Sequence, residues 1–143
     1  MHSATSSRPP RWRLLPRRAG LVVLTVAVAG CAGGSGAAAA DVALRFHAAV
    51  AGGDGATACG LLAPQTRSEL RQSAQRPCPA AVLEEEVPQV GGVRSSSLSG
   101  SQAQVRLEGD TVFLAEFPRG WRVVAAACTP RPPLPYDCRI KGV

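Results

Sequence analysis

The sequence predicts an α+β fold in which N-terminal helices pack on a curved antiparallel sheet. Two observations carry this prediction. Between residues 37 and 87, apolar side chains recur at helical spacing, and glycine or proline interrupts each segment. Between residues 92 and 128, apolar and polar residues alternate, with short turn signals between the segments. Helices followed by an antiparallel meander are the order typical of α+β folds.

Four helices are expected in the first half of the chain, over residues 37–51, 55–62, 67–74 and 80–87. The first ends at a pair of glycines, after which Asp54 is placed to cap the second. Thr66 and Glu69 have the spacing of a capping box, which opens the third helix. Pro79 is a favourable first residue for the fourth.

Four strands are expected in the second half, over residues 92–98, 104–108, 111–117 and 121–128. Gly109-Asp110 predicts a two-residue hairpin loop, and residues 118–120 predict a three-residue turn. These loop lengths fix which side chains share a face. The face expected to receive the helices carries Val105, Leu107, Val112, Leu114, Val124 and Ala126.

The opposite face of the sheet is also apolar, because it carries Phe113, Phe117 and Trp121. An apolar face of this kind has to be covered. The expected cover is the proline-rich tail over residues 129–136, a stiff extended segment. The alternative is that a partner protein or a second copy of the chain docks on this face.

Basic residues are concentrated at the N-terminus. The chain has 16 Lys and Arg against 10 Asp and Glu, a formal charge of +6. Five of the arginines lie in the first eighteen residues, which contain no carboxylate, so 11 cations and 10 acids remain from Cys31 onward. The remainder is nearly neutral, its cations are dispersed, and aromatics are few. The sequence therefore predicts no nucleic-acid partner.

The first thirty residues have the organisation of an export signal. An arginine-rich stretch precedes an apolar run over residues 19–28. The ending Val28-Ala29-Gly30-Cys31 resembles the lipobox of bacterial lipoproteins. In that family the cysteine receives a diacylglyceryl group and becomes the new N-terminus after cleavage. The alternative is an uncleaved membrane anchor over residues 19–40, although its second half is rich in glycine.

The lipobox resemblance implies a lipid attachment site at Cys31 and a protein held on the outer face of the cell membrane by acyl chains such as palmitate. The expected organisation is a signal peptide over residues 1–30, a flexible tether over residues 31–40 and one domain over residues 41–143.

Assigning Cys31 to lipid leaves four cysteines, an even number that suits an oxidising compartment. Three pairings are open, and we favour the two local ones, Cys59 with Cys78 and Cys128 with Cys138. A zinc site is the alternative, but neither gap has the spacing of paired CxxC ligands. No metal and no cofactor is expected.

Two segments carry a resemblance that covers nearly all of the exported chain. The stretch DVALRFHAAVAGGDGATACGLL, residues 41–62, and the closing segment from Gly120-Trp121 to Pro135-Tyr136-Asp137-Cys138 resemble actinobacterial lipoproteins with a nuclear-transport-factor-like cone domain. This superfamily includes ketosteroid isomerase and polyketide-cyclase-like proteins of the SnoaL type. The resemblance implies the cystatin-like cone roll, and it leaves the activity open because that fold hosts enzymes, binders and scaffolds.

No catalytic residue is assigned. An isomerase of this fold needs a carboxylate base inside the cone. The bases on offer are His47, expected beside the apolar face of the first helix, Glu108 at a hairpin end, and Glu116, expected opposite Arg122 on the next strand. Asp110 is assigned to the turn that follows Gly109. The acidic run at residues 84–86 is expected to be solvated.

The sequence thus favours a non-catalytic, membrane-anchored lipoprotein of the cell envelope. Its expected partners, besides the membrane, are a small apolar ligand in the cone or an envelope protein, and a homodimer is also open. Two alternatives remain: an isomerase- or cyclase-like enzyme, and a purely structural envelope protein.

Overall fold

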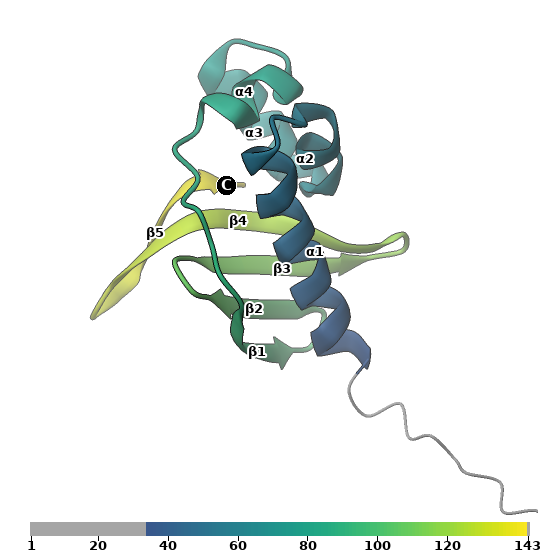
Figure 1. Cartoon of the computed structure of the whole chain (residues 1–143), viewed down its shortest axis with the longest axis vertical. Helices are drawn as coiled ribbons and strands as arrows, with labels where there is room; N and C mark the ends of the chain where they lie inside the picture. Colours follow the sequence, from purple (N-terminus) through teal and green to yellow (C-terminus); the bar gives the residue numbers. More distant parts are fainter. Residues whose placement is uncertain (1–33, 143) are drawn as a thin grey trace, which may run out of the picture. The chain divides into compact units, whose positions relative to one another are not determined.

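Four helices precede five antiparallel strands in residues 34–142, the part of the chain that the computed structural model describes (Figure 1). The expected α+β class is confirmed. The chain divides into two units, Met1–Gly30 and Cys31–Val143, and every described residue belongs to the second. The expected export signal and the expected lipidation site at Cys31 lie outside the described residues.

The helices are α1 (Gly34–Ala51), α2 (Gly55–Leu61), α3 (Pro64–Ala74) and α4 (Cys78–Glu84). The strands are β1 (Val93–Ser99), β2 (Gln102–Leu107), β3 (Thr111–Phe117), β4 (Gly120–Arg131) and β5 (Leu134–Lys141). They pair in sequence order, each antiparallel to the next. Helix α1 crosses one face of the sheet and contacts β1 to β4, whereas α2 to α4 gather near the β4–β5 edge (Figure 1).

Helix α1 begins earlier than expected. The tether was expected to extend to Ala40, but residues 34–40 are helical. The four alanines at residues 37–40, which the tether shared with the helix expected from residue 37, favour the helix because alanine has the highest helix propensity. Only two residues, Ala32 and Gly33, lie between Cys31 and the start of the helix.

The two expected caps have different outcomes. Asp54 caps α2, and its Oδ1 accepts a hydrogen bond from the Thr57 backbone N–H at 3.0 Å. Hydrogen bonds from the Thr57 side chain and backbone lower the pKa of the Asp54 carboxyl. The capping box at Thr66 was wrong, because α3 already begins at Pro64. The buried Thr66 hydroxyl instead donates to the Val124 carbonyl oxygen of β4 at 2.9 Å.

The turn between β3 and β4 differs from the expected one by one residue. Phe117 lies opposite Gly120, so the loop is Pro118-Arg119 and has two residues instead of three. This shift turns Trp121 and Val123 toward the helices, where both are buried. A bulge between Phe113 and Leu114 then restores the expected register, which returns Ala126 to the core.

The proline-rich tail forms the second half of a β-hairpin. Strand β4 continues to Arg131, and β5 pairs back along it at the edge of the sheet. The expected extended conformation is present, but the tail adds a strand to the edge of the sheet instead of lying across its outer face. Tyr136 contacts that face, with its ring edge-on to Phe113 at 5.1 Å between centroids.

Side chains fill the space between the helices and the sheet. The largest of the fully buried side chains are Phe46, Leu62, Leu114, Ile140, Val82, Val105, Val112, Val123 and Thr66. They come from α1, the α2–α3 connection, α3, α4 and β2 to β5, so one core joins both halves of the fold. The helix-facing side of the sheet is thus closed by direct packing.

Two disulfides join neighbouring elements. Cys59 of α2 pairs with Cys78 of α4, and Cys128 of β4 pairs with Cys138 of β5. These are the pairs that the sequence favours. With their thiols joined in disulfides, the four cysteines cannot serve as thiolate ligands of the alternative zinc site.

Candidate functional site

The three candidate bases are not brought together. Glu108 follows β2 and Glu116 lies near the end of β3, and both are exposed. Strand β3 separates them, and it is about 20 Å long at 3.3 Å per residue. His47 is buried in α1. This arrangement offers no pair of catalytic groups converging on one substrate.

His47 is instead paired with Asp110, and this pair is the main buried polar feature of residues 34–142. The Nε2 atom of His47 lies 3.0 Å from Oδ2 of Asp110. Only 3% of the histidine side chain and 1% of the aspartate side chain are exposed. The two atoms are close, but their geometry is not that of an aligned hydrogen bond.

The carboxylate of Asp110 also holds three backbone N–H groups. Its Oδ1 accepts from Thr111 at 2.7 Å and from Cys128 at 2.8 Å, and its Oδ2 accepts from Ala127 at 2.9 Å. Ala127 has a φ of 55°, a left-handed conformation that is unfavourable for alanine. Asp110 therefore holds the irregular backbone of β4 at Ala127 against the β2–β3 connection by hydrogen bonds.

The second ring nitrogen of His47 faces another oxygen. Its Nδ1 lies 3.2 Å from the carbonyl oxygen of Pro88, in the connection between α4 and β1. Both ring nitrogens of His47 thus face an oxygen atom of another part of the chain. His47 links α1 to two connections and, through Asp110, to β4.

Sequence reasoning placed His47 on the flank of the helix and Asp110 in a turn, and it did not connect them. No local motif marks the pair, because the two residues belong to different halves of the chain. Within the described residues, neither group can reach a substrate in solvent while the pair is closed. Its chemical role here is to satisfy buried charge and to fix the chain.

The apolar patch on the outer face of the sheet contains fewer residues than expected. Phe113 packs with Ala125, Tyr136 and the Cys128–Cys138 disulfide, and the Tyr136 hydroxyl accepts a hydrogen bond from Gln104 Nε2 at 3.3 Å. Phe117 lies next to the β3–β4 turn and is 36% exposed. Trp121 does not belong to this face, because only 5% of it is exposed and it lies in the main core.

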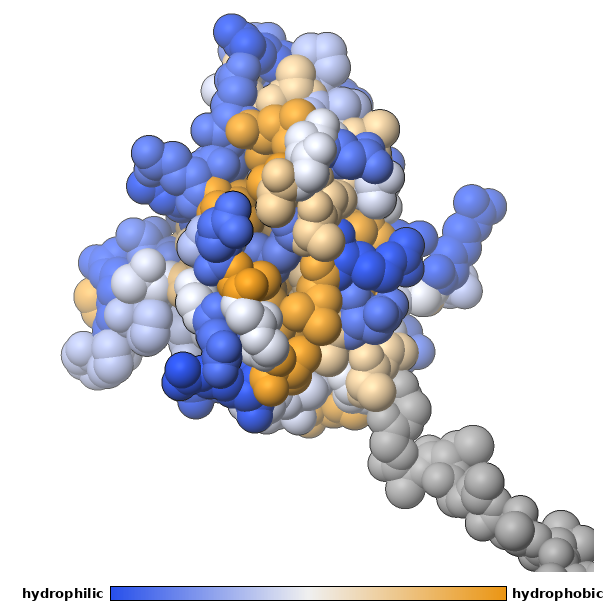
Figure 2. Space-filling model, in the orientation of Figure 1, coloured by the Kyte–Doolittle hydropathy of each residue, from blue (hydrophilic) through white to orange (hydrophobic). Residues whose placement is uncertain are grey.

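Apolar side chains also gather on the face over α1 and the α4–β1 connection (Figure 2). Leu44 of α1 and Leu83 of α4 are among the exposed large apolar residues, at 36% and 39%. Val87 and Val90 of the connection are half-buried against the core. Exposed apolar residues of this kind are typical of surfaces that contact other molecules.

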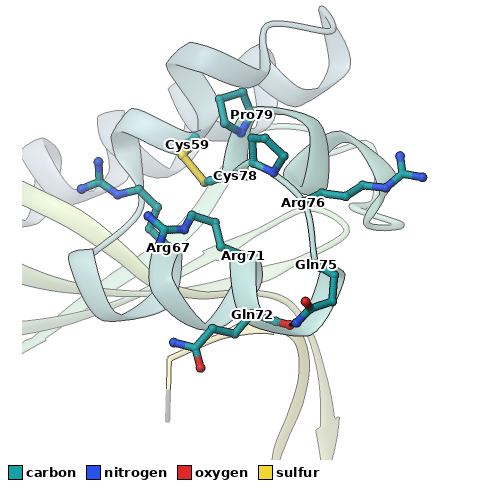
Figure 3. Close-up of a pocket in the computed structure, with 9 residues that line it drawn as sticks. Cys59, Arg67, Arg71, Gln72, Gln75, Arg76, Cys78 and Pro79 are labelled. Carbon is teal, nitrogen blue, oxygen red and sulfur yellow. Dashed lines mark hydrogen bonds between the residues drawn. A yellow bond between two sulfur atoms is a disulfide. The ribbon is translucent and has the colours of Figure 1, made fainter.

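A surface hollow of about 680 Å³ lies beside the Cys59–Cys78 disulfide (Figure 3). Arg67 and Arg71, one helical turn apart on α3, lie on one side of the disulfide, and Arg76 extends away on the other side (Figure 3). Arg76 is already paired with Glu84. The hollow is open, and its cations could contact an anionic group.

A second hollow, of about 440 Å³, continues from Arg67 toward the β3–β4 turn. Its lining residues are Gly60, Pro64, Arg67, Phe117, Pro118, Arg119 and Arg122. Within residues 34–142, no carboxylate oxygen lies within 4.0 Å of a guanidinium nitrogen of Arg67, Arg119 or Arg122. Sequence reasoning missed this group, because its members belong to α3, a turn and β4.

The acidic run is partly neutralised. Glu84 pairs with Arg76, and Glu86 pairs with Arg139 of β5. Both ion pairs are more than half exposed, so each contributes little to stability. Among the described residues, no group of three His, Cys, Asp or Glu side chains is placed to hold a metal ion.

None of the helices within residues 34–142 is long and apolar enough to cross a bilayer. Comparisons with protein-family models, with curated proteins and with solved structures give no match for this chain.

Proposed function

We propose that this protein is a non-catalytic module of the cell envelope, anchored by lipid at Cys31 on the outer face of the membrane. In this proposal the module acts through its outer surface, by contact with an envelope partner. The anchor is supported by the basic and apolar segments before Val28-Ala29-Gly30-Cys31. It is also supported by the fold, since α1 begins at Gly34, directly after the proposed attachment site.

We also propose that the fold is of the nuclear-transport-factor-like cone type. The order of elements supports this, with helices before an antiparallel meander and α1 across one face of the sheet. In such folds a ligand or an active site would occupy the space between helices and sheet. Here Phe46, Leu62 and Leu114 are fully buried in that space.

The filled interior is the observation that carries the proposal of an outer-surface role. None of the hollows that open near α1, α3 or the sheet ends is lined by these three side chains. A small apolar ligand would have to displace core side chains, which a closely packed interior resists. The apolar side chains over α1 and the α4–β1 connection favour a contact surface instead (Figure 2).

The enzyme alternative gains no support from the arrangement of its bases. His47 is engaged by Asp110 and Pro88, while Glu108 and Glu116 lie at opposite ends of β3.

A purely structural envelope protein fits the filled core equally well. Identification of a partner that binds the outer surface would distinguish the proposed contact module from a purely structural protein.

Replacing Cys31 with serine tests the proposed address. The wild-type chain is expected in the membrane fraction and to incorporate labelled palmitate, because two or more acyl chains give stable anchoring. Cys31→Ser is expected to lose the label and to be released or to remain as an unprocessed precursor. Cys59→Ser is the control, and it should keep the label. Label that persists on Cys31→Ser would show that the lipobox interpretation is wrong.

A further inference from the structure

We infer that the β3–β4 end of the domain docks on anionic phospholipid headgroups through an arginine face, defined as Arg67, Arg119 and Arg122. This inference rests on the proposed anchor at Cys31 and adds an orientation to it. The domain would then lie against the membrane that holds it, with these three guanidinium groups toward the lipid.

The composition of the face suits a lipid surface. Its three arginines surround a hollow whose other walls include Pro64, Phe117 and Pro118. A guanidinium group presents a planar fork of donors that matches phosphate oxygens. Phe117 and Pro118 are exposed beside these cations, and aromatic or apolar groups next to arginine are typical of residues at the membrane interface.

The position of the face follows from the short connection to Cys31. Gly34 is three positions after Cys31, so the two residues are at most about 10 Å apart. The start of α1 therefore stays close to the acyl chains. Arg119 and Arg122 share a third hollow, of about 450 Å³, with Ala38, Asp41 and Val42 of α1. Ala38 lies only about 6 Å along the helix from Gly34. The arginine face is thus next to the anchored end of the domain.

Charge is distributed unevenly over the domain. From Cys31 onward the net charge is only +1, so attraction to an anionic surface has to come from a local excess of cations. The acidic run begins at Glu84, the last residue of α4, and both Glu84 and Glu86 are paired with other arginines. Arg45 lines the third hollow, but it is paired with Asp41 at 3.9 Å. At the β3–β4 end of the domain, Arg67, Arg119 and Arg122 have no such partner among the described residues, so they are the cations there that can interact with phosphate groups.

The test uses the unit from residue 31 to residue 143 with Cys31→Ser, which contains every described helix, strand and disulfide. Its co-sedimentation is measured with vesicles of phosphatidylcholine, alone or mixed with an equal amount of phosphatidylglycerol. Binding is expected to the mixed vesicles only and to weaken with salt. An arginine near an anionic surface changes the partition coefficient about fivefold, so Arg119→Gln with Arg122→Gln should lower it roughly 25-fold.

The matched control is Arg94→Gln with Arg106→Gln, which removes the same charge at the opposite end of the sheet. It should lower the partition coefficient less than about twofold. Arg122 is half-buried and donates to the Trp121 carbonyl oxygen at 2.9 Å, so thermal unfolding of each variant is measured too. Arg119→Gln alone, at the exposed turn, should still give the fivefold loss.

Three results would overturn the inference: no binding to the mixed vesicles, an equal loss in the two double variants, or binding to polyglutamate in place of phosphatidylglycerol. The last would indicate an acidic polymer as the partner. Because the unit tested carries no lipid, these outcomes do not depend on acylation of Cys31. Palmitate labelling of the wild-type chain tests that step separately.

Discussion

Asp110→Ala is expected to lower the free energy of unfolding by about 3–5 kcal/mol, which is the usual effect of removing one partner of a buried ion pair. The substitution leaves the buried His47 ring without its carboxylate. It also leaves the N–H groups of Thr111, Ala127 and Cys128 without their acceptor. Urea unfolding followed by circular dichroism measures the change, as a shift of the midpoint at constant slope.

The matched control for Asp110 is Asp137→Ala. Asp137 also forms an ion pair, with Arg131 at 3.5 Å, but 58% of its side chain is exposed. Exposed pairs contribute about 0–1 kcal/mol, so the control should unfold close to the wild type. Equal stability losses in the two variants would contradict the assignment of His47 and Asp110 as the polar centre of the fold.

Trp121→Ala is the second substitution with a large expected effect, a loss of about 3–5 kcal/mol in the free energy of unfolding. Trp121 is 5% exposed and packs in the main core. Phe117, four residues earlier, is 36% exposed on the outer side. Phe117→Ala should therefore change stability by less than about 1 kcal/mol, since exposed positions tolerate substitution.

The comparison of Trp121 with Phe117 tests the register of β3 and β4. In the three-residue turn expected from the sequence, Trp121 would lie on the outer face and the two substitutions would have similar small effects. With the two-residue turn at Pro118-Arg119, only Trp121 is in the core. Denaturant unfolding of both variants separates these arrangements, and a stable Trp121→Ala variant would contradict the structure.

The features that the sequence predicted correctly depend on local signals. Asp54 after a pair of glycines marks the start of α2, and its cap is present in the structure. The alternation of apolar residues predicts the antiparallel meander, which the structure confirms. The even number of cysteines after Cys31 favours disulfides, and the two local pairs that were favoured among the three possible pairings are both formed.

The features that it missed depend on register and on contacts between distant residues. A turn shorter by one residue moves every side chain of the following strand to the opposite face, which is what happens to Trp121 and Val123. The pair of His47 with Asp110 has no local signature, since its geometry requires α1 to be already docked on the sheet. The tether expected over residues 31–40 overlapped the helix expected from residue 37, and the structure extends that helix back to Gly34.

The arginine face is another feature that depends on contacts between residues distant in the sequence. Its cations are dispersed along the sequence, so no basic segment marks them there. The fold nevertheless places Arg67 of α3 beside Arg119 of the turn and Arg122 of β4. A group assembled from three separate elements becomes visible only once the chain is folded.

The central claim, a lipid-anchored module with a filled interior, is tested most directly by the intact mass of the wild-type chain extracted from membranes. Native mass spectrometry is expected to show a chain that begins at Cys31, carries a diacylglyceryl group and holds no further apolar ligand. A chain that still contains residues 1–30, or one that begins at Cys31 without acyl chains, would contradict the anchor. A co-purified apolar ligand would contradict the filled interior.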